Sequence, residues 1–293
     1  MRSALFVPGD DEKKLGKGLS SGADAVIVDL EDSVASEAKS RARTIAAAFL
    51  RAAAASPTRP RLLVRVNPLD SGLTDDDLDA IMPAAPECVM LPKSLSGASV
   101  QHLAAKIAVR EAQHDLADGS TTIIALATET AAAVSTLASY RKCSPRLEGL
   151  TWGGEDLSAD LGAETNREPD GSWAGPYRLA RNLTLLGAVA AGVAPIDTVF
   201  TNFRDGAGLR AEALMARRDG FTGKMAIHPA QIPIINEVFT PTPEALAKAR
   251  AIVAAFAAKP AVGVVAIDGE MFDRPHLLRA QRLIARAGRV LDP

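Results

Sequence analysis

The chain has few cysteines, no long apolar run and almost no excess charge, and each of these scarcities excludes a class of protein. Its two cysteines, Cys88 and Cys143, lack metal-ligand spacing and form no disulfide framework, so we expect both to be packing residues in a reducing cytoplasm. A net charge of −2, with lysine and arginine spread along the chain, is unsuited to wrapping nucleic acid or docking on an anionic membrane. The aliphatic stretch after Arg2 is too short for a signal peptide, and no window reaches the length of a membrane span.

What the chain does have is apolar content, because 47% of its residues are hydrophobic and 23% are charged, which suffices for a large core and argues against disorder. Short runs of β-branched and aliphatic residues alternate with longer alanine-rich amphipathic stretches, as is typical of βα units around a parallel sheet. Thr74 and Asp77 resemble a capping box at the start of one helix. We expect strands over residues 4–7, 25–30, 61–66, 88–91, 122–127, 149–152, 197–200 and 223–227, and helices over residues 36–55, 74–82, 99–116, 130–140, 176–191 and 209–218.

Eight strands with intervening helices predict an α/β fold, a closed (β/α)8 TIM barrel over residues 1–240. The rival is a doubly wound open sheet, which normally carries a glycine-rich phosphate loop after its first strand; here residues 9–12 hold one glycine and three acids. Residues 241–293 exceed what a barrel needs. Pro241 and Pro243 signal a helix start, and the segment is expected to be a helical extension that covers the site as a lid.

Two acids follow successive predicted strands, Glu129 after the fifth and Asp156 after the sixth. The carboxyl ends of parallel strands meet at one face, where barrels and open sheets bind ligands. Two carboxylates at that face can hold Mg²⁺, with waters and substrate oxygens completing its coordination. The alternative for Asp156 is a cap at the next helix start. Gly153 and Gly154 favour the metal site, because glycines allow close backbone approach to a ligand.

Arg65 is a charge inside an otherwise apolar strand and therefore needs a partner. An acid of the barrel interior would serve, but we favour a substrate carboxylate or thioester oxygen, which suits the planar guanidinium. Three acids in four residues, Asp29, Glu31 and Asp32, end the second strand, which is tolerable only beside a cation. We expect them to hold metal-bound waters or Lys93; the alternative is capping of the helix that follows.

The chain resembles the HpcH/HpaI aldolase and citrate lyase β-subunit family, particularly its stand-alone CitE-like acyl-CoA lyases. The resemblance implies a TIM barrel with Mg²⁺ on Glu129 and Asp156, and with Arg65 on the carbonyl or carboxylate end of the substrate. It spans nearly the whole chain in order. The matching stretches are residues 2–10, 21–33, 65–67, 91–93, 128–130, 153–157, 223–229 and 271–275.

The same resemblance implies that Asp273 is the catalytic acid or base, carried by a lid that covers a neighbouring subunit, in a homotrimer or a hexamer of trimers. The residue-level alternative for Asp273 is a helix cap before Pro275. Coenzyme A contacts carry over to Lys13 and to the backbone near Met225 and Ala226. The three lysines that begin with Lys13 could equally be an ordinary solvated helix face.

These groups suit a Mg²⁺-dependent carbon–carbon lyase that cleaves a malyl-, citramalyl- or citryl-CoA thioester to an oxo acid and an acyl-CoA. Thioester hydrolysis is a side activity if water is admitted. One alternative is the citryl-carrier-protein lyase subunit of a multi-protein citrate lyase. Another is a non-enzymatic barrel scaffold, which the presence of Arg65, Glu129, Asp156 and Asp273 disfavours. The long tail counts against a carrier-free pyruvate aldolase.

Overall fold

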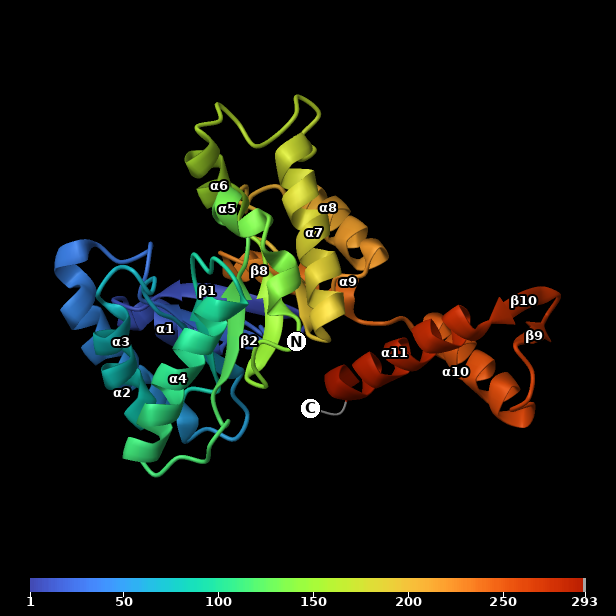
Figure 1. Cartoon of the computed structure of the whole chain (residues 1–293), viewed down its shortest axis with the longest axis horizontal. Helices are drawn as coiled ribbons and strands as arrows, with labels where there is room; N and C mark the ends of the chain where they lie inside the picture. Colours follow the sequence, from blue (N-terminus) through green and yellow to red (C-terminus); the bar gives the residue numbers. More distant parts are fainter. Residues whose placement is uncertain (292–293) are drawn as a thin grey trace.

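The computed structural model describes residues 1–291 of the chain, with side chains through residue 288, and its centre is a closed barrel (Figure 1). Eight parallel strands pair in sequence order, and β1 pairs with β8 to close the ring. The predicted (β/α)8 barrel is therefore confirmed. The strands are β1 (Ser3–Pro8), β2 (Ala25–Asp29), β3 (Arg61–Arg65), β4 (Cys88–Leu91), β5 (Thr122–Leu126), β6 (Leu147–Thr151), β7 (Ala194–Asp197) and β8 (Gly223–Ala226).

The strands are apolar on both faces because each face packs against its own core. Alternate residues such as Ile27, Leu63 and Met90 fill the barrel interior. Their neighbours, among them Val26 and Val64, pack outward against the helices. The helices are α1 (Glu12–Leu19), α2 (Lys39–Ala54), α3 (Thr74–Ile81), α4 (Gly97–Gln113), α5 (Ala131–Val134), α6 (Gly154–Leu161), α7 (Gly175–Ala191), α8 (Gly206–Asp219) and α9 (Ile232–Phe239). Within residues 1–291, no helix has both the length and the apolar character needed to cross a membrane.

Three local predictions were wrong. The seventh strand lies at Ala194–Asp197 rather than at residues 197–200, since the β-branched run that suggested it continues past the sheet edge. The helix over residues 130–140 is broken into α5 and a 3₁₀ turn, η3 (Leu137–Tyr140), where the Thr136 hydroxyl donates to the Leu95 and Ala133 carbonyls.

The predicted capping box is the third error. Thr74 is not the N-cap of α3; its hydroxyl donates to the backbone carbonyls of Asn67 and Pro68. Asp77 is fully buried and accepts from Arg43 and Asn67 instead. The two residues therefore tie α3 to the loop after β3 and to α2.

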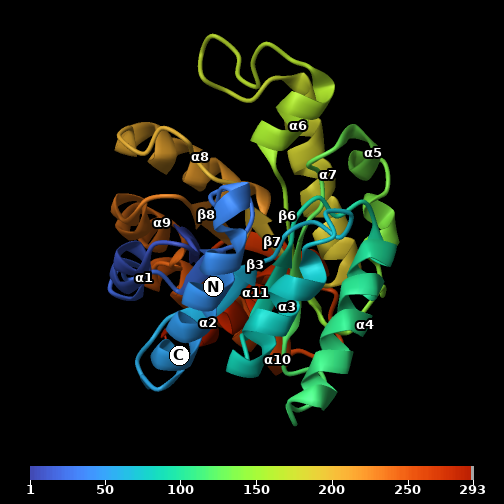
Figure 2. The same ribbon diagram turned by 90° about the vertical axis from the view of Figure 1, so that its left-hand side faces the viewer.

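After the barrel, α10 (Pro243–Ala258), β9 (Val264–Ile267), β10 (Glu270–Asp273) and α11 (Arg274–Leu291) form an extension with its own apolar core. Figure 1 shows the extension standing apart from the barrel, and Figure 2 shows it behind the barrel when the molecule is turned. The antiparallel β9–β10 pair joins its two long helices.

The extension leaves from the amino-terminal face of the barrel. Arg2 precedes β1, and its guanidinium binds Asp24, which precedes β2, at 2.7 Å. The same guanidinium donates to the hydroxyl of Thr240, between α9 and α10, at 2.9 Å. The first residues of the extension are thus fixed at the face opposite the carboxyl ends of the strands.

A buried ion pair secures the same face at β6. The guanidinium of Arg146, just before β6, donates to both carboxylate oxygens of Glu111 at 2.8 and 2.6 Å. Glu111 is 1% exposed and lies in α4. Arg146→Met would leave this buried carboxylate with backbone hydrogen bonds from Gly119 and Thr121 but without a cation. We expect a loss of about 3–5 kcal/mol in the free energy of unfolding, measured by urea denaturation; a loss below about 1 kcal/mol, typical of an exposed pair, would contradict it.

Candidate active site

Glu129 and Asp156 lie side by side at the carboxyl ends of β5 and β6, two neighbouring strands. Asp156 is in the first turn of α6, and Glu129 is 2% exposed. Gly153 leaves room for the Glu129 side chain, since a Cβ there would lie 2.7 Å from the Glu129 Cγ. Any other residue at position 153 would displace one of the two carboxylates.

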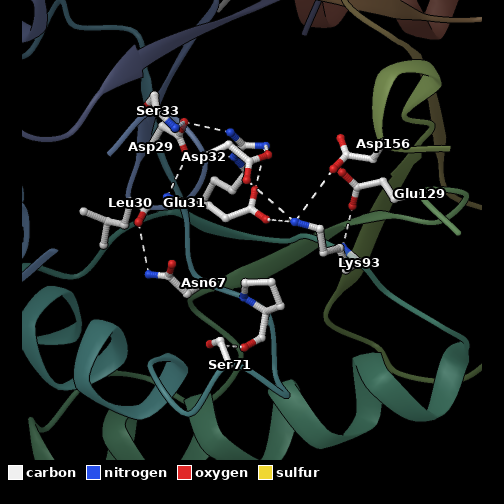
Figure 3. A network of polar contacts seen from close by, with 12 residues as sticks. Asp29, Leu30, Glu31, Asp32, Ser33, Asn67, Ser71, Lys93, Glu129 and Asp156 are labelled. Carbon is white, nitrogen blue, oxygen red and sulfur yellow. Dashed lines mark hydrogen bonds and ion pairs between the residues drawn. The ribbon is translucent and has the colours of Figure 1, made fainter. Parts of the chain in front are cut away.

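Lys93 joins these two acids to those of the second strand (Figure 3). Its backbone N–H donates to the Glu129 carboxylate at 2.5 Å, and its ammonium lies 3.7 Å from Asp156. The ammonium also contacts Glu31 at 2.7 Å and Asp32 at 3.6 Å. Lys93 has φ of +48°, a left-handed conformation that costs a non-glycine residue energy and is found at constrained sites.

Arg65 contacts all three acids of the β2 end, most closely Asp29 and Glu31, with Asp32 at 3.7 Å. Its Nε and Nη2 donate to the two Asp29 oxygens at 2.7 Å each, and its Nη1 lies 2.8 Å from Glu31. Burial by itself would lower the pKa of Arg65, but the hydrogen bonds and charge of Asp29 and the charge of Glu31 outweigh burial and raise it. The guanidinium also lies over the Phe6 ring, 4.8 Å from its centroid. The interior acid that the sequence left open as a partner is present, and a substrate contact stays a prediction.

The electrostatics of the acid pair favour a bound cation. Burial, and then the charge of Asp156, raise the pKa of Glu129 to about 8. Two such carboxylates resist ionising together, and a divalent cation between them removes that conflict. Among residues 1–291 no group of three or more histidine, cysteine, aspartate or glutamate side chains is arranged to hold a metal. A hard cation that takes two carboxylates and keeps several waters, as Mg²⁺ does, fits this pair.

The remaining candidates are distributed more widely. Asp29 binds Arg65 and the backbone N–H groups of Glu31 and Ser33, whereas Glu31 and Asp32 are the acids that contact Lys93. In the outer layer, Lys13 is exposed on α1. Met225 and Ala226 are buried in β8, paired with Ala4 and Leu5 of β1.

Asp273 lies in the extension, and the structure does not bring it to Glu129 and Asp156 of the same chain. It precedes α11 and accepts a 3.3 Å hydrogen bond from the backbone N–H of His276, so the cap that the sequence left open is present. Its carboxylate also pairs with the His276 ring Nδ1. This hydrogen bond holds the pKa of Asp273 below its ordinary value.

Sequence reasoning missed one group close to this site, a fully buried ammonium at Lys224 in β8. A signal was available, because Lys224 is a charge inside a buried strand in the same way as Arg65. Asp197 and Glu212 are its partners, at 2.7 and 2.8 Å. They come from β7 and α8, and the sequence alone does not place them beside Lys224.

Comparisons with known proteins agree with this fold. A profile described as HpcH/HpaI aldolase/citrate lyase matches residues 2–229, and one described as a C-C bond lyase of the TIM-barrel fold matches residues 178–289. The chain is 34% identical to citrate lyase subunit beta of Leuconostoc mesenteroides subsp. cremoris, over 99% of this chain and 95% of that protein. It is also 34% identical to mitochondrial citramalyl-CoA lyase of Homo sapiens, over 98% of this chain and 85% of that one. A crystal structure of CitE from Mycobacterium tuberculosis with magnesium, acetoacetate and coenzyme A gives a TM-score of 0.78 at 34% identity and covers 98% of each chain.

The raised pKa of Glu129 predicts how metal-free stability depends on pH. Between pH 4.5 and about 8, the folded chain keeps a proton on Glu129 that the unfolded chain releases, so stability falls as pH rises through this window. Glu129→Gln has no such proton. In the presence of a chelator, urea denaturation should show that the free energy of unfolding of the variant rises relative to that of wild type as pH increases. The change should be up to about 1.4 kcal/mol per pH unit. Parallel stability profiles for the two proteins would contradict this, and saturating Mg²⁺ should flatten the wild-type profile.

Proposed function

The chain belongs to the HpcH/HpaI aldolase/citrate lyase family, and from this premise we propose that it is a Mg²⁺-dependent carbon–carbon lyase acting on a 3-hydroxy-carboxyacyl-CoA thioester. Malyl-, citramalyl- and citryl-CoA are the substrates we expect, each cleaved reversibly to an oxo acid and an acyl-CoA. One observation carries the proposal. Two carboxylates, the buried Glu129 and the partly exposed Asp156, sit beside two cations, Arg65 and Lys93, at the carboxyl ends of the barrel strands.

Glu129 and Asp156 are the residues that would hold Mg²⁺. When bound there, Mg²⁺ supplies Lewis-acid polarisation of the hydroxyl and carboxylate oxygens of the oxo-acid half. Side chains and backbone groups of the protein position these ligands. Lys93 orients Glu129 through its backbone N–H, and its ammonium holds the acids of β2 clear of the metal ligands.

Arg65 is the residue we assign to the carbonyl or carboxylate end of the substrate. Asp29 fixes its Nε and Nη2, so the orientation of the guanidinium plane is set before any substrate arrives. A preorganised cation costs no reorganisation when negative charge develops on an oxygen during cleavage. Lys13 and the backbone near Met225 and Ala226 are the proposed contacts for coenzyme A.

Cleavage breaks the bond between the acyl α-carbon and the carbinol carbon. A base takes the hydroxyl proton as the new carbonyl forms, and the electron pair of the broken bond becomes a thioester enolate, which then takes up a proton at its α-carbon to give the acyl-CoA. We assign Asp273, an exposed carboxylate at the end of β10, to the proton transfer at that α-carbon, in line with the family resemblance. Closure of the extension over the mouth would exclude water from the enolate, and incomplete closure would allow thioester hydrolysis.

Asp273 would reach the site of a neighbouring subunit rather than its own. The support is geometric, because Arg2 and Thr240 fix the start of the extension at the amino-terminal face of the barrel, away from the mouth. If each subunit supplies its extension to the next one, the subunits form a closed ring. We propose that this ring is a homotrimer, or a hexamer built from trimers, in the cytoplasm. Residues 1–240 then form the catalytic barrel, and residues 241–293 the lid for the next copy.

Turnover of a thioester panel tests the function. Purified protein is given malyl-, citramalyl- and citryl-CoA with and without Mg²⁺, and the released oxo acid and free thiol are measured separately. We expect Mg²⁺-dependent release of glyoxylate, pyruvate or oxaloacetate. Thiol release without oxo acid would instead indicate a thioesterase. No turnover of any of the three thioesters, with Mg²⁺ bound, would contradict a CoA-dependent lyase and favour a carrier-protein substrate. An assay with citryl-carrier protein would then detect the activity.

Complementation between two inactive variants tests the shared site. Asp273→Asn should lower kcat by about 10²- to 10⁴-fold and leave Mg²⁺ affinity unchanged, because Asp273 lies outside the metal pair. Glu129→Gln should lose Mg²⁺ binding and activity. Co-assembled in equal amounts, the two should regain about a quarter of wild-type activity, since that share of sites combines an intact barrel with an intact lid. No recovery in verified mixed oligomers would place Asp273 in its own chain's site.

A further inference from the structure

Lys224 is a fully buried ammonium on the outer side of the barrel wall. It lies in β8, whose next residue, Met225, belongs to the barrel interior, whereas Lys224 contacts α8 outside the wall. Its Nζ donates to Asp197 at 2.7 Å and to Glu212 at 2.8 Å. With no exposed surface, this ammonium cannot touch a substrate in the barrel mouth. Its two carboxylate partners each make a further contact.

The first contact leads to the end of β6. The indole N–H of Trp152, directly after β6, donates to the second oxygen of Asp197 at 2.8 Å. Trp152 and Asp197 are both completely buried, so this hydrogen bond is shielded from water. Lys224 therefore fixes, through Asp197, the orientation of the Trp152 ring.

The second contact leads to the segment between α6 and α7. Arg167 donates to the other oxygen of Glu212 at 2.7 Å. The guanidinium of Arg167 also stacks on the Trp173 ring, 3.3 Å from its centroid. Trp173 in turn packs edge-on against Trp152, with ring centroids 4.7 Å apart. The two paths from Lys224 thus end on two tryptophans that touch one another.

These two tryptophans form the wall behind the metal pair. A Cβ at Gly154, the first residue of α6, would lie 2.8 Å from the Trp173 ring and 3.2 Å from Trp152. Two residues later, α6 carries Asp156. Gly153, between Trp152 and Gly154 in the chain, is the residue against which the Glu129 side chain rests. A rotation of either indole would therefore shift Glu129, Asp156 or both.

We infer that Lys224 is a positioning residue, which sets the separation of Glu129 and Asp156 through the Asp197–Trp152 and Glu212–Arg167–Trp173 contacts. This inference rests on the proposed Mg²⁺ site and adds a residue that never touches the metal. Charge within the network is balanced, so it needs no outside ligand. Its members are Lys224, Arg167 and Arg181 as cations, and Asp197, Glu212 and Asp219 as anions.

Mg²⁺ affinity, measured by titration calorimetry without substrate, tests this role. Lys224→Met removes the ammonium that Asp197 and Glu212 share. It can prevent folding, because two buried carboxylates lose their cationic partner. Trp152→Phe is the milder variant, since it keeps an aromatic ring and removes only the indole N–H and part of the packing. We expect Trp152→Phe to raise the Mg²⁺ Kd about tenfold, the lower end of what distant supporting residues contribute at metal sites. Arg146→Met is the matched control.

Arg146 supports β6 from its opposite end and belongs to a separate buried ion pair with Glu111. Its variant should lose stability and keep the wild-type Mg²⁺ Kd. An unchanged Kd in folded Trp152→Phe would overturn the positioning role and leave the proposed function standing. A Kd that rises equally in Arg146→Met would also overturn it, because general destabilisation would then explain the effect. Wild-type protein that binds no Mg²⁺ would overturn the metal site and this inference together.

Discussion

The candidate site is governed by one electrostatic conflict, the placing of two carboxylates at adjacent strand ends, where burial and the charge of Asp156 both resist ionisation of Glu129. Glu129 has a pKa of about 8 because it is buried and faces Asp156. Cations next to the pair reduce the conflict without removing it: Lys93 reaches Asp156 at 3.7 Å but binds Glu31 more closely. Without metal, the pair is therefore stabilised by taking up either a proton or a divalent cation. This preference favours the binding of Mg²⁺.

Closure of the barrel makes this conflict possible. Arg65, Lys93, Glu129 and Asp156 follow four consecutive strands, and parallel pairing in sequence order delivers all four side chains to one rim. The acids of β2 neutralise the two cations of the site. Asp29 pairs with Arg65, and Glu31 and Asp32 pair with Lys93. The two cations are fixed in place before substrate binds, at the cost of leaving the metal pair partly uncompensated.

Much of this was predictable because it depends on local pattern. Alternating apolar runs gave seven strands near their observed places, and strand-end acids pointed to Glu129 and Asp156, which the structure brings together as the candidate metal pair. The seventh strand was misplaced because residues 198–200 look as β-branched as the true strand but continue beyond its pairing with β8. Lys224 was missed for a different reason: its partners come from other elements. The β7–β8 register places Asp197 beside it, and the packing of α8 on the barrel brings Glu212. The direction in which the extension leaves is likewise set by contacts such as Arg2 with Thr240, which no local pattern encodes.

That exit from the amino-terminal face has a consequence for how the activity is governed in a cell. In the proposed shared-site assembly, a lone chain would carry a mouth without its lid and a lid without its mouth, so chemistry and assembly would be a single equilibrium. Catalytic output would then rise more steeply than in proportion to the amount of chain when the protein is scarce, and level off to proportionality once every copy has neighbours. In that assembly, the abundance of the chain would itself control flux.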